Sequence, residues 1–243
     1  MYVSNHSGAD ETIVKYDSAG TYVTKWDFDP GVGDCEGLTV AAGTDGVEYV
    51  FGAQCSTSKI FKYSTSGTLI DDDFATVAGP AFGMSSDASV FVYVAYEDGN
   101  IQRLSPSGIA SCTCLADAVT NPDGFEDCAA DADLNIFGSG QTKLAKYDKF
   151  GTKLVEVAGL PSAGTTYRGR GIAVGSDGCV AGTDPVNSKV VIYDNELNIV
   201  KAWGGPGASE GTEFNAPYAV AFDGDGLLYV VDQGNRRVQV FKP

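Results

Sequence analysis

The feature that most constrains the fold of this chain is an internal repeat. A strand-like segment that ends in a large apolar residue and runs into a turn recurs along the sequence, as in IVKYDSAGTYV (13–23), IFKYSTSGTLI (60–70) and LAKYDKFGTKL (144–154). Successive anchor residues are 47, 41, 43, 46 and 48 positions apart: Tyr16, Tyr63, Leu104, Tyr147, Tyr193 and Phe241. Six copies at this spacing predict one structural unit used six times.

A second recurring segment precedes every anchor except the first. It consists of an alternating apolar strand, a tight turn and another strand, as in GLTVAAGTDGVEYVFG (37–52) and AVAFDGDGLLYVVD (219–232). Each unit therefore contains four short strands rich in Val, Tyr and Phe, and no window of 12 or more residues keeps a helical apolar period. Four-stranded units at this period predict an all-β, six-bladed β-propeller whose antiparallel blades surround a central channel.

The blades are expected to form a single domain over residues 1–243, with the first and last blades incomplete. The pattern contains 22 strands where six full blades need 24, because strand a of the first blade and strand d of the last are missing. This predicts either a fragment of a longer chain or a propeller with two thin blades. The approximate blade bounds are 1–27, 28–73, 74–117, 118–159, 160–204 and 205–243.

The net charge, the apolar runs and the number of cysteines limit the classes of partner and the cellular location that we expect for this chain. The net charge of −16 disfavours nucleic acid, and no apolar run is long enough to span a membrane. The first ten residues lack the pattern of a signal peptide. Six cysteines are many for a cytosolic protein, so we expect an extracellular or cell-surface location. Cys112 and Cys114 are too closely spaced for a zinc knuckle, and His6 is the single histidine.

The last unit carries a family resemblance. Residues 203–241, WGGPGASEGTEFNAPYAVAFDGDGLLYVVDQGNRRVQVF, resemble an NHL repeat, and the other units are degenerate versions of it. The resemblance implies a six-bladed propeller of a family whose members are mostly interaction modules on extracellular, sensor or scaffold proteins. A few relatives are enzymes, and the lyases among them that process amidated peptides use zinc-bound histidines, which this chain lacks.

Two motifs of that unit have alternative explanations. Asp223-Gly224-Asp225-Gly226 resembles part of a calcium loop, but the segment after it supplies no further carboxylate at the required positions. A turn between two strands is the favoured interpretation, because similar turn residues recur at the same place in other units. Arg237 could bind an anion, but a charge-assisted hydrogen bond to Asp232 that fixes the loop is the favoured role.

The cysteines allow one disulfide prediction. Cys35 lies just before one strand and Cys55 just after its antiparallel neighbour, so the two ends meet at one edge and a Cys35–Cys55 disulfide is geometrically reasonable. Cys128 and Cys179 align with inward strand positions and are expected to be buried thiols. Cys112 and Cys114 remain unassigned.

A functional site is expected at the channel mouth, where each innermost strand begins. The residue type at these positions differs from unit to unit, whereas the strands have similar sequences in every unit. Such variation is expected where a repeated scaffold carries a functional site. The alternative is that these are ordinary loop residues. The equivalent mouth positions are Glu36, Phe82, Glu126, Arg170 and Tyr218, and Asp34, Asp123, Tyr167 and Arg168 lie close by in the entry loops.

Three functions remain open. The leading prediction is a non-enzymatic binding or scaffold module, without a cofactor, that recognises a protein or carbohydrate through the channel mouth or blade edges, because one histidine cannot complete a Ser/His/Asp or Cys/His set. The rival is a lactonase-like hydrolase in which Glu36, Asp123 and Glu126 hold calcium or another divalent ion that activates water. The third is a homo-oligomer or filament in which a neighbouring copy supplies the missing strands.

Overall fold

The computed structural model describes residues 1–5, 11–28, 35–87, 90–96, 99–108, 110–113, 124–140, 142–158 and 170–243. These residues form antiparallel sheets, one per blade. The first blade contains β1 (Tyr2–Asn5), β2 (Thr12–Tyr16) and β3 (Tyr22–Asp27). The second contains β4 (Cys35–Ala42), β5 (Glu48–Gln54), β6 (Lys59–Ser64) and β7 (Leu69–Thr76). The third contains β8 (Ala81–Ser86), β9 (Val92–Tyr96), β10 (Asn100–Leu104) and β11 (Ala110–Thr113).

The remaining three blades follow the same up-and-down order. The fourth contains β12 (Phe125–Ala130), β13 (Ile136–Gly140), β14 (Lys143–Tyr147) and β15 (Lys153–Ala158). The fifth contains β16 (Ile172–Val174), β17 (Val180–Asp184), β18 (Lys189–Tyr193) and β19 (Ile199–Gly204). The sixth contains β20 (Pro217–Phe222), β21 (Leu228–Asp232), the short 3-10 helix η1 (Gln233–Asn235) and β22 (Arg237–Phe241).

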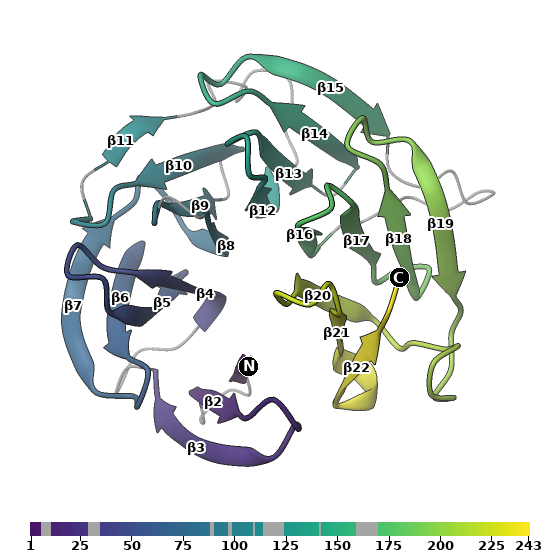
Figure 1. The fold of residues 1–243 in the computed structure, drawn as a ribbon, viewed down its shortest axis with the longest axis horizontal. Coiled ribbons are helices and arrows are strands. Elements are labelled where there is room, and N and C mark those ends of the chain that lie inside the picture. Colours follow the sequence, from purple (N-terminus) through teal and green to yellow (C-terminus); the bar gives the residue numbers. More distant parts are fainter. Residues whose placement is uncertain are drawn as a thin grey trace.

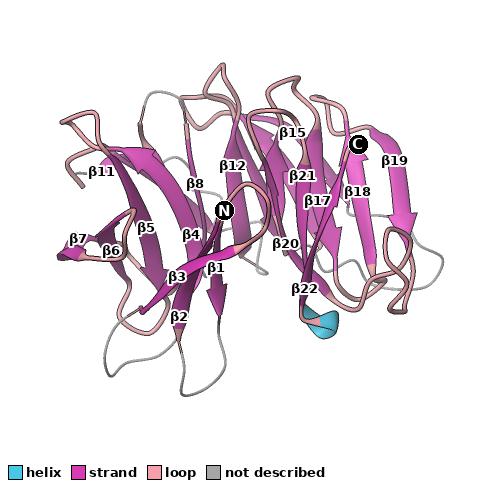
Figure 2. Ribbon diagram, turned by 60° about the horizontal axis from the view of Figure 1, so that its bottom comes forward, coloured by secondary structure: helices cyan, strands magenta, loops and turns pink. Residues whose placement is uncertain are grey.

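The six sheets are arranged around a central axis (Figure 1). Strands β4, β8, β12, β16 and β20 face the axis, and β3, β7, β15 and β19 lie on the outer rim. The strands run between two ends of the molecule, and η1 lies at one of them (Figure 2). The six-bladed fold is confirmed, and the described residues contain the predicted 22 strands, with three in the first and last blades. Strand β7 extends to Thr76, past the expected blade boundary at residue 73.

The apolar core is divided among the blade interfaces. Each of five buried clusters in the described part of the chain combines side chains from two successive blades. The cluster between the second and third blades, for example, joins Phe51 and Phe74 to Met84 and Val94. The anchors Tyr63, Leu104, Tyr147 and Tyr193 are at most 2% exposed, because each ends a central strand that is covered on both faces. Burial at these five interfaces between successive blades therefore explains the apolar period of the repeat.

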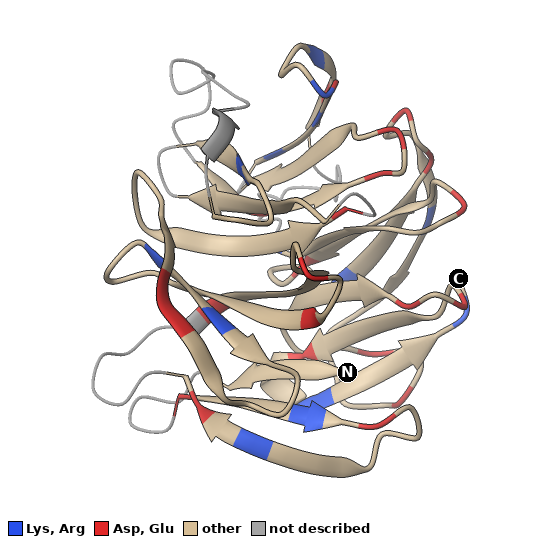
Figure 3. Ribbon diagram, turned by 60° about the vertical axis from the view of Figure 1, so that its left-hand side comes forward, with Lys and Arg blue, Asp and Glu red and all other residues tan. Residues whose placement is uncertain are grey.

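Aspartates close many of the turns between strands. In the turn between β20 and β21, Asp223 accepts hydrogen bonds from the backbone N–H groups of Asp225 (3.0 Å) and Leu227 (2.9 Å), and Gly226 adopts a φ of +76°. These bonds lower the pKa of Asp223, and its carboxylate serves the turn, as predicted. Many of the acidic segments in Figure 3 fall on such turns, so turn chemistry accounts for part of the net charge of −16.

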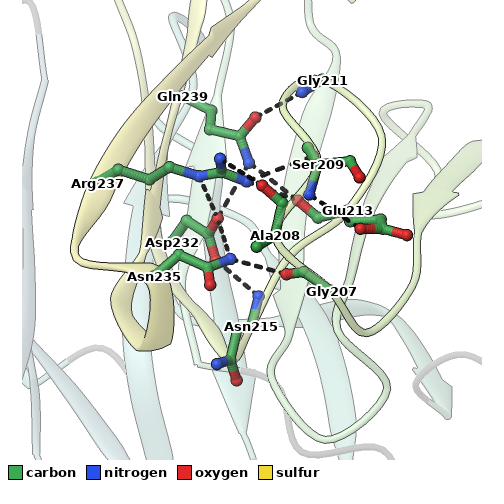
Figure 4. Close-up of polar contacts among 10 residues, drawn as sticks. All are labelled: Gly207, Ala208, Ser209, Gly211, Glu213, Asn215, Asp232, Asn235, Arg237 and Gln239. Atoms are coloured by element: carbon green, nitrogen blue, oxygen red, sulfur yellow. Dashed lines mark hydrogen bonds and ion pairs between the residues drawn. The ribbon is translucent and has the colours of Figure 1, made fainter.

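The last repeat unit, residues 203–241, ends in a polar clamp (Figure 4). Asp232 is fully buried and accepts hydrogen bonds from Arg237 Nε (2.8 Å), Asn235 Nδ2 (2.9 Å) and the backbone N–H of Asn215 (2.7 Å). The Arg237 guanidinium also donates to carbonyl groups of the loop between β19 and β20, including that of Ala208 (2.8 Å). The predicted Arg237–Asp232 pair is confirmed, and it ties that loop to the last blade.

The cysteine predictions have mixed outcomes. Cys128 is buried, as predicted, whereas Cys179 is only half-buried because it closes the turn before β17 begins. Cys35 pairs in strand register with Gln54, next to Cys55. No disulfide is seen in the residues that the structure describes, so the Cys35–Cys55 bond is not confirmed. In the same part of the chain, no helix is long and apolar enough to cross a membrane.

Candidate functional site at the channel mouth

The mouth residues project from irregular points in the innermost strands. In β4 the pairing with β5 passes from Cys35 to Gly37 and leaves Glu36 without a partner residue. The same register shift omits Glu126 in β12 and Tyr218 in β20. A β-bulge leaves one residue out of the ladder and turns its side chain, which is why bulges are common beside functional sites. Three mouth residues from three different blades are thus placed by the same local device.

Four of the five predicted mouth residues form one hydrogen-bonded group, here called the mouth cluster: Glu36, Glu126, Arg170 and Tyr218. Arg170 Nη1 donates to Glu126 Oε2 (2.8 Å) and to the Tyr218 hydroxyl (2.9 Å). The Tyr218 hydroxyl in turn donates to Glu36 Oε2 (3.2 Å). The cluster therefore joins the second, fourth, fifth and sixth blades through side chains up to 182 positions apart.

The protonation of Tyr218 follows from its surroundings. Burial raises its pKa to about 12, and the negative charge of Glu36 adds to this effect while Arg170 opposes it. The Arg170 guanidinium also lies over the Tyr218 ring, 4.9 Å from the ring centroid. Tyr218 is therefore a neutral hydrogen-bond donor at neutral pH, held between a cation and a carboxylate.

A buried threonine, which the sequence analysis did not identify, aligns the backbones of the fifth and sixth blades. Thr183, on β17, accepts a hydrogen bond from the backbone N–H of Gly171 (2.8 Å) and donates to the carbonyl of Tyr218 (3.0 Å). These two contacts fix the chain next to Arg170 and at Tyr218 itself. A single threonine in a strand has no distinctive sequence pattern, so only the fold reveals this role.

Asp127 was also missed, although the sequence contained a signal for it. It follows Glu126 directly, and burial raises the pKa of its carboxyl group to about 7 despite hydrogen bonds from the backbone N–H groups of Ile172 and Cys128 (both 2.9 Å). The corresponding residues in other blades are Gly37, Gly83, Gly171 and Ala219. The sequence signal is that an acidic residue occupies a position where the other units have glycine or alanine.

The other predicted site residues either lie outside the mouth cluster or belong to segments that the structure does not describe. Phe82 is half-buried on β8, and it takes part in none of the hydrogen bonds that hold the mouth cluster together. Asp123, the third acid of the proposed metal site, lies outside the described residues, as do His6, Asp34, Tyr167 and Arg168. Within the described part of the chain, no group of three or more His, Cys, Asp or Glu side chains is arranged to hold a metal ion.

Comparisons with known proteins support the fold and give no family. No protein-family model and no curated protein matches the chain. Among solved structures, a streptogramin B lyase superimposes with a TM-score of 0.66 at 16% identity, covering 95% of this chain and 72% of that one. A catalytically inactive virginiamycin B lyase from Staphylococcus aureus, solved with quinupristin, gives 0.63 at 14%, covering 95% and 76%. Hydrazine synthase from Kuenenia stuttgartiensis gives 0.67 at 12%, covering 100% and 92%.

These neighbours correct one prediction. The expectation that the chain is not an enzyme is overturned, because the propeller fold that it shares with them is used by lyases. That expectation depended on the lack of a second histidine, but Tyr218, Arg170 and Glu36 assemble a proton donor, a cation and a carboxylate without one.

Proposed function

We propose that the mouth cluster binds a carbohydrate and carries out acid–base chemistry on it. The observation that carries this proposal is the position of the Tyr218 hydroxyl, which accepts a hydrogen bond from Arg170 (2.9 Å) and donates one to Glu36 (3.2 Å). A proton donor between a guanidinium and a carboxylate can give up its proton to a substrate oxygen and recover one afterwards.

Each member of the cluster has a distinct proposed role. Tyr218 is the general acid, because its pKa of about 12 keeps it protonated. Glu36 is the general base, since it already accepts the Tyr218 proton in a hydrogen bond. Arg170 stabilises negative charge that develops on a substrate oxygen, and Glu126, whose side chain is 9% exposed, holds the guanidinium in place.

The choice of ligand rests on complementarity. Sugar hydroxyls both donate and accept hydrogen bonds, and the cluster offers carboxylate acceptors beside phenol and guanidinium donors. With a net charge of −16, the protein favours neutral over anionic sugars. A cyclic peptide is the second candidate substrate, because one of the neighbouring lyases was solved with quinupristin. The NHL-like character of residues 203–241 is part of the same proposal, because that family includes a few enzymes.

A substrate panel tests the proposal. Neutral oligosaccharides, oligosaccharides that contain uronic acid, and quinupristin are incubated with the protein, and the products are weighed by mass spectrometry. Hydrolysis adds the mass of water to the products, whereas elimination does not. Binding is followed in parallel by ligand-detected NMR. If no member of the panel binds or changes mass, the proposal fails.

Matched tyrosine variants identify the site. Tyr218→Phe removes the proposed acid, and we expect it to lower turnover by about 10²-fold or more. Tyr229→Phe is the control, since it removes a hydroxyl that hydrogen-bonds to a carboxylate (3.0 Å to Asp223) in the same blade but away from the mouth cluster. Equal activity of the two variants would place the chemistry elsewhere.

A further inference from the structure

At Gly37, Gly83 and Gly171, the position after the mouth residue lies in close contact with the innermost strand of the next blade. A Cβ atom at Gly171 would lie 2.7 Å from the Cα of Ala219 on the next blade, and one at Gly37 would collide with the Phe82 carbonyl. Only very small side chains fit where two backbones approach this closely. Asp127 occupies the same position in the fourth blade. Its carboxyl group therefore lies at a point where, in the second, third and fifth blades, the backbones of two neighbouring strands are in direct contact.

The Asp127 carboxylate bridges the fourth and fifth blades next to the segments that carry Glu126 and Arg170. One oxygen accepts the N–H of Cys128 on its own strand, and the other accepts the N–H of Ile172 at the start of β16 (both 2.9 Å). Asp127 follows Glu126, and Ile172 lies two residues after Arg170. The carboxylate therefore ties together the same two segments that the Glu126–Arg170 ion pair joins at the surface (2.8 Å).

We propose that Asp127 is a positioning residue that sets Arg170 against Glu126 and Tyr218, and that its protonation makes ligand binding at the mouth cluster depend on pH. The inference rests on the proposed function of that cluster. The ionised carboxylate has two full acceptors for its two N–H donors, whereas the protonated group has one strong acceptor left. The bridge between the two blades is therefore complete only when Asp127 is ionised. Because the bridge positions Arg170, we expect the affinity of the mouth cluster for its ligand to rise with pH.

The charges around Asp127 suit a group that titrates near neutrality. Burial is the main cause that raises its pKa to about 7, the two backbone N–H donors oppose it, and the neighbouring charge of Glu126 adds to it. Arg170 provides the nearby positive charge through its pair with Glu126. Burial also raises the pKa of the adjacent Cys128 thiol, which stays neutral.

The strands packed against β12 add little further charge. Strands β8 (AFGMSS), β13 (IFGSG) and β16 (IAV) contain no titratable side chain. On β9, burial raises the pKa of the Tyr93 hydroxyl above its ordinary value, and the hydrogen bond that this hydroxyl donates to Asp87 (2.7 Å) adds to the effect. On β10 the guanidinium of Arg103 lies over the Phe91 ring. A change near neutral pH in this region is thus assigned to Asp127.

A ligand-free titration tests the positioning role. Tyrosines are labelled with ¹³C, the Tyr218 ring signal is assigned with Tyr218→Phe, and its chemical shift is followed from about pH 5 to about pH 9. We expect a midpoint near pH 7 in the parent protein and none in Asp127→Asn. Asp148→Asn, in an exposed turn of the same blade, should keep the midpoint. A midpoint that persists in Asp127→Asn overturns the inference, as does its absence in the parent.

A binding titration tests the coupling to ligand. A neutral oligosaccharide that binds the parent protein should bind about tenfold more tightly at pH 8 than at pH 6, and Asp127→Asn should remove that dependence. If Asp127→Asn fails to fold, Asp127→Gly replaces it, because glycine is the residue that the repeat uses here. If no oligosaccharide binds, the proposed function fails, and the ligand-free NMR midpoint alone decides the role of Asp127.

Discussion

Replacing Asp232 by asparagine tests the clamp that ties the β19–β20 loop to the last blade. The change keeps the shape of the side chain and removes its charge. One oxygen of Asp232 accepts hydrogen bonds from Arg237, Asn235 and Gln239, and the other accepts the N–H of Asn215. An amide has one acceptor oxygen, so at least one donor loses its partner and Arg237 loses its counter-charge.

The expected cost follows from these contacts. Removing one partner of a buried ion pair costs about 3–5 kcal/mol. The Arg237 side chain is 22% exposed and keeps backbone carbonyl acceptors at Ala208 and Glu213, which places the cost near the lower limit. We therefore expect Asp232→Asn to lower the free energy of unfolding by about 3 kcal/mol, or the melting temperature by roughly 6–12 °C.

The assay is urea unfolding followed by the fluorescence of Trp203, whose ring centroid lies 5.4 Å from that of Phe241 in the last blade. The matched control is Asp184→Asn in the fifth blade, where Asp184 accepts two hydrogen bonds from Asn187 and Lys189 stands in place of Arg237. That variant should lose only about 1 kcal/mol. If the two variants cost the same, the Arg237 pair does not stabilise the fold as argued.

Acid should reduce the difference between Asp232→Asn and the parent protein. Burial alone would raise the pKa of Asp232, but hydrogen bonds from Asn215, Asn235 and Arg237 outweigh it and hold the pKa below its ordinary value. A lowered pKa contributes stability that is present above the unfolded-state value of 3.8 and lost as the pH falls through the folded-state value. The two unfolding curves should therefore converge in strong acid.

Three further predictions concern two residues at blade interfaces and one pair of cysteines within the second blade. Gly83→Ala should cost about 2 kcal/mol in thermal or urea unfolding, because a Cβ atom there meets Asp127, whereas Gly224→Ala, with no atom within 4 Å, should be neutral. Because the folded-state pKa of Asp127 is about 7 and its ordinary value 3.8, stability should fall by up to about 4 kcal/mol between about pH 4 and about pH 8, and Asp127→Asn should abolish that fall. Peptide mapping without reductant should find Cys35 linked to Cys55, and two unmodified thiols would refute that disulfide.

Much of the fold could be predicted because its units are local and repeated. Anchors such as Tyr63 and Tyr147 recur at nearly constant spacing, and each repeat brings its own turn chemistry, as at Asp223. The mouth positions could be found in the same way, by aligning the units and looking for variation. Cys179 is an exception, because the repeat pattern predicts a strand position for it whereas it belongs to the turn before β17.

Sequence alone therefore determined the six-bladed propeller and its strand order, and it predicted the ring of mouth positions, because the repeat pattern is visible within each unit. Only the tertiary structure decided how those positions meet. The register shifts at Glu36, Glu126 and Tyr218 lie within single blades, but the Tyr218–Glu36 hydrogen bond joins side chains of different blades, 182 positions apart. The ionisation of Asp127 depends on how closely two blades approach, a distance that no single repeat unit specifies.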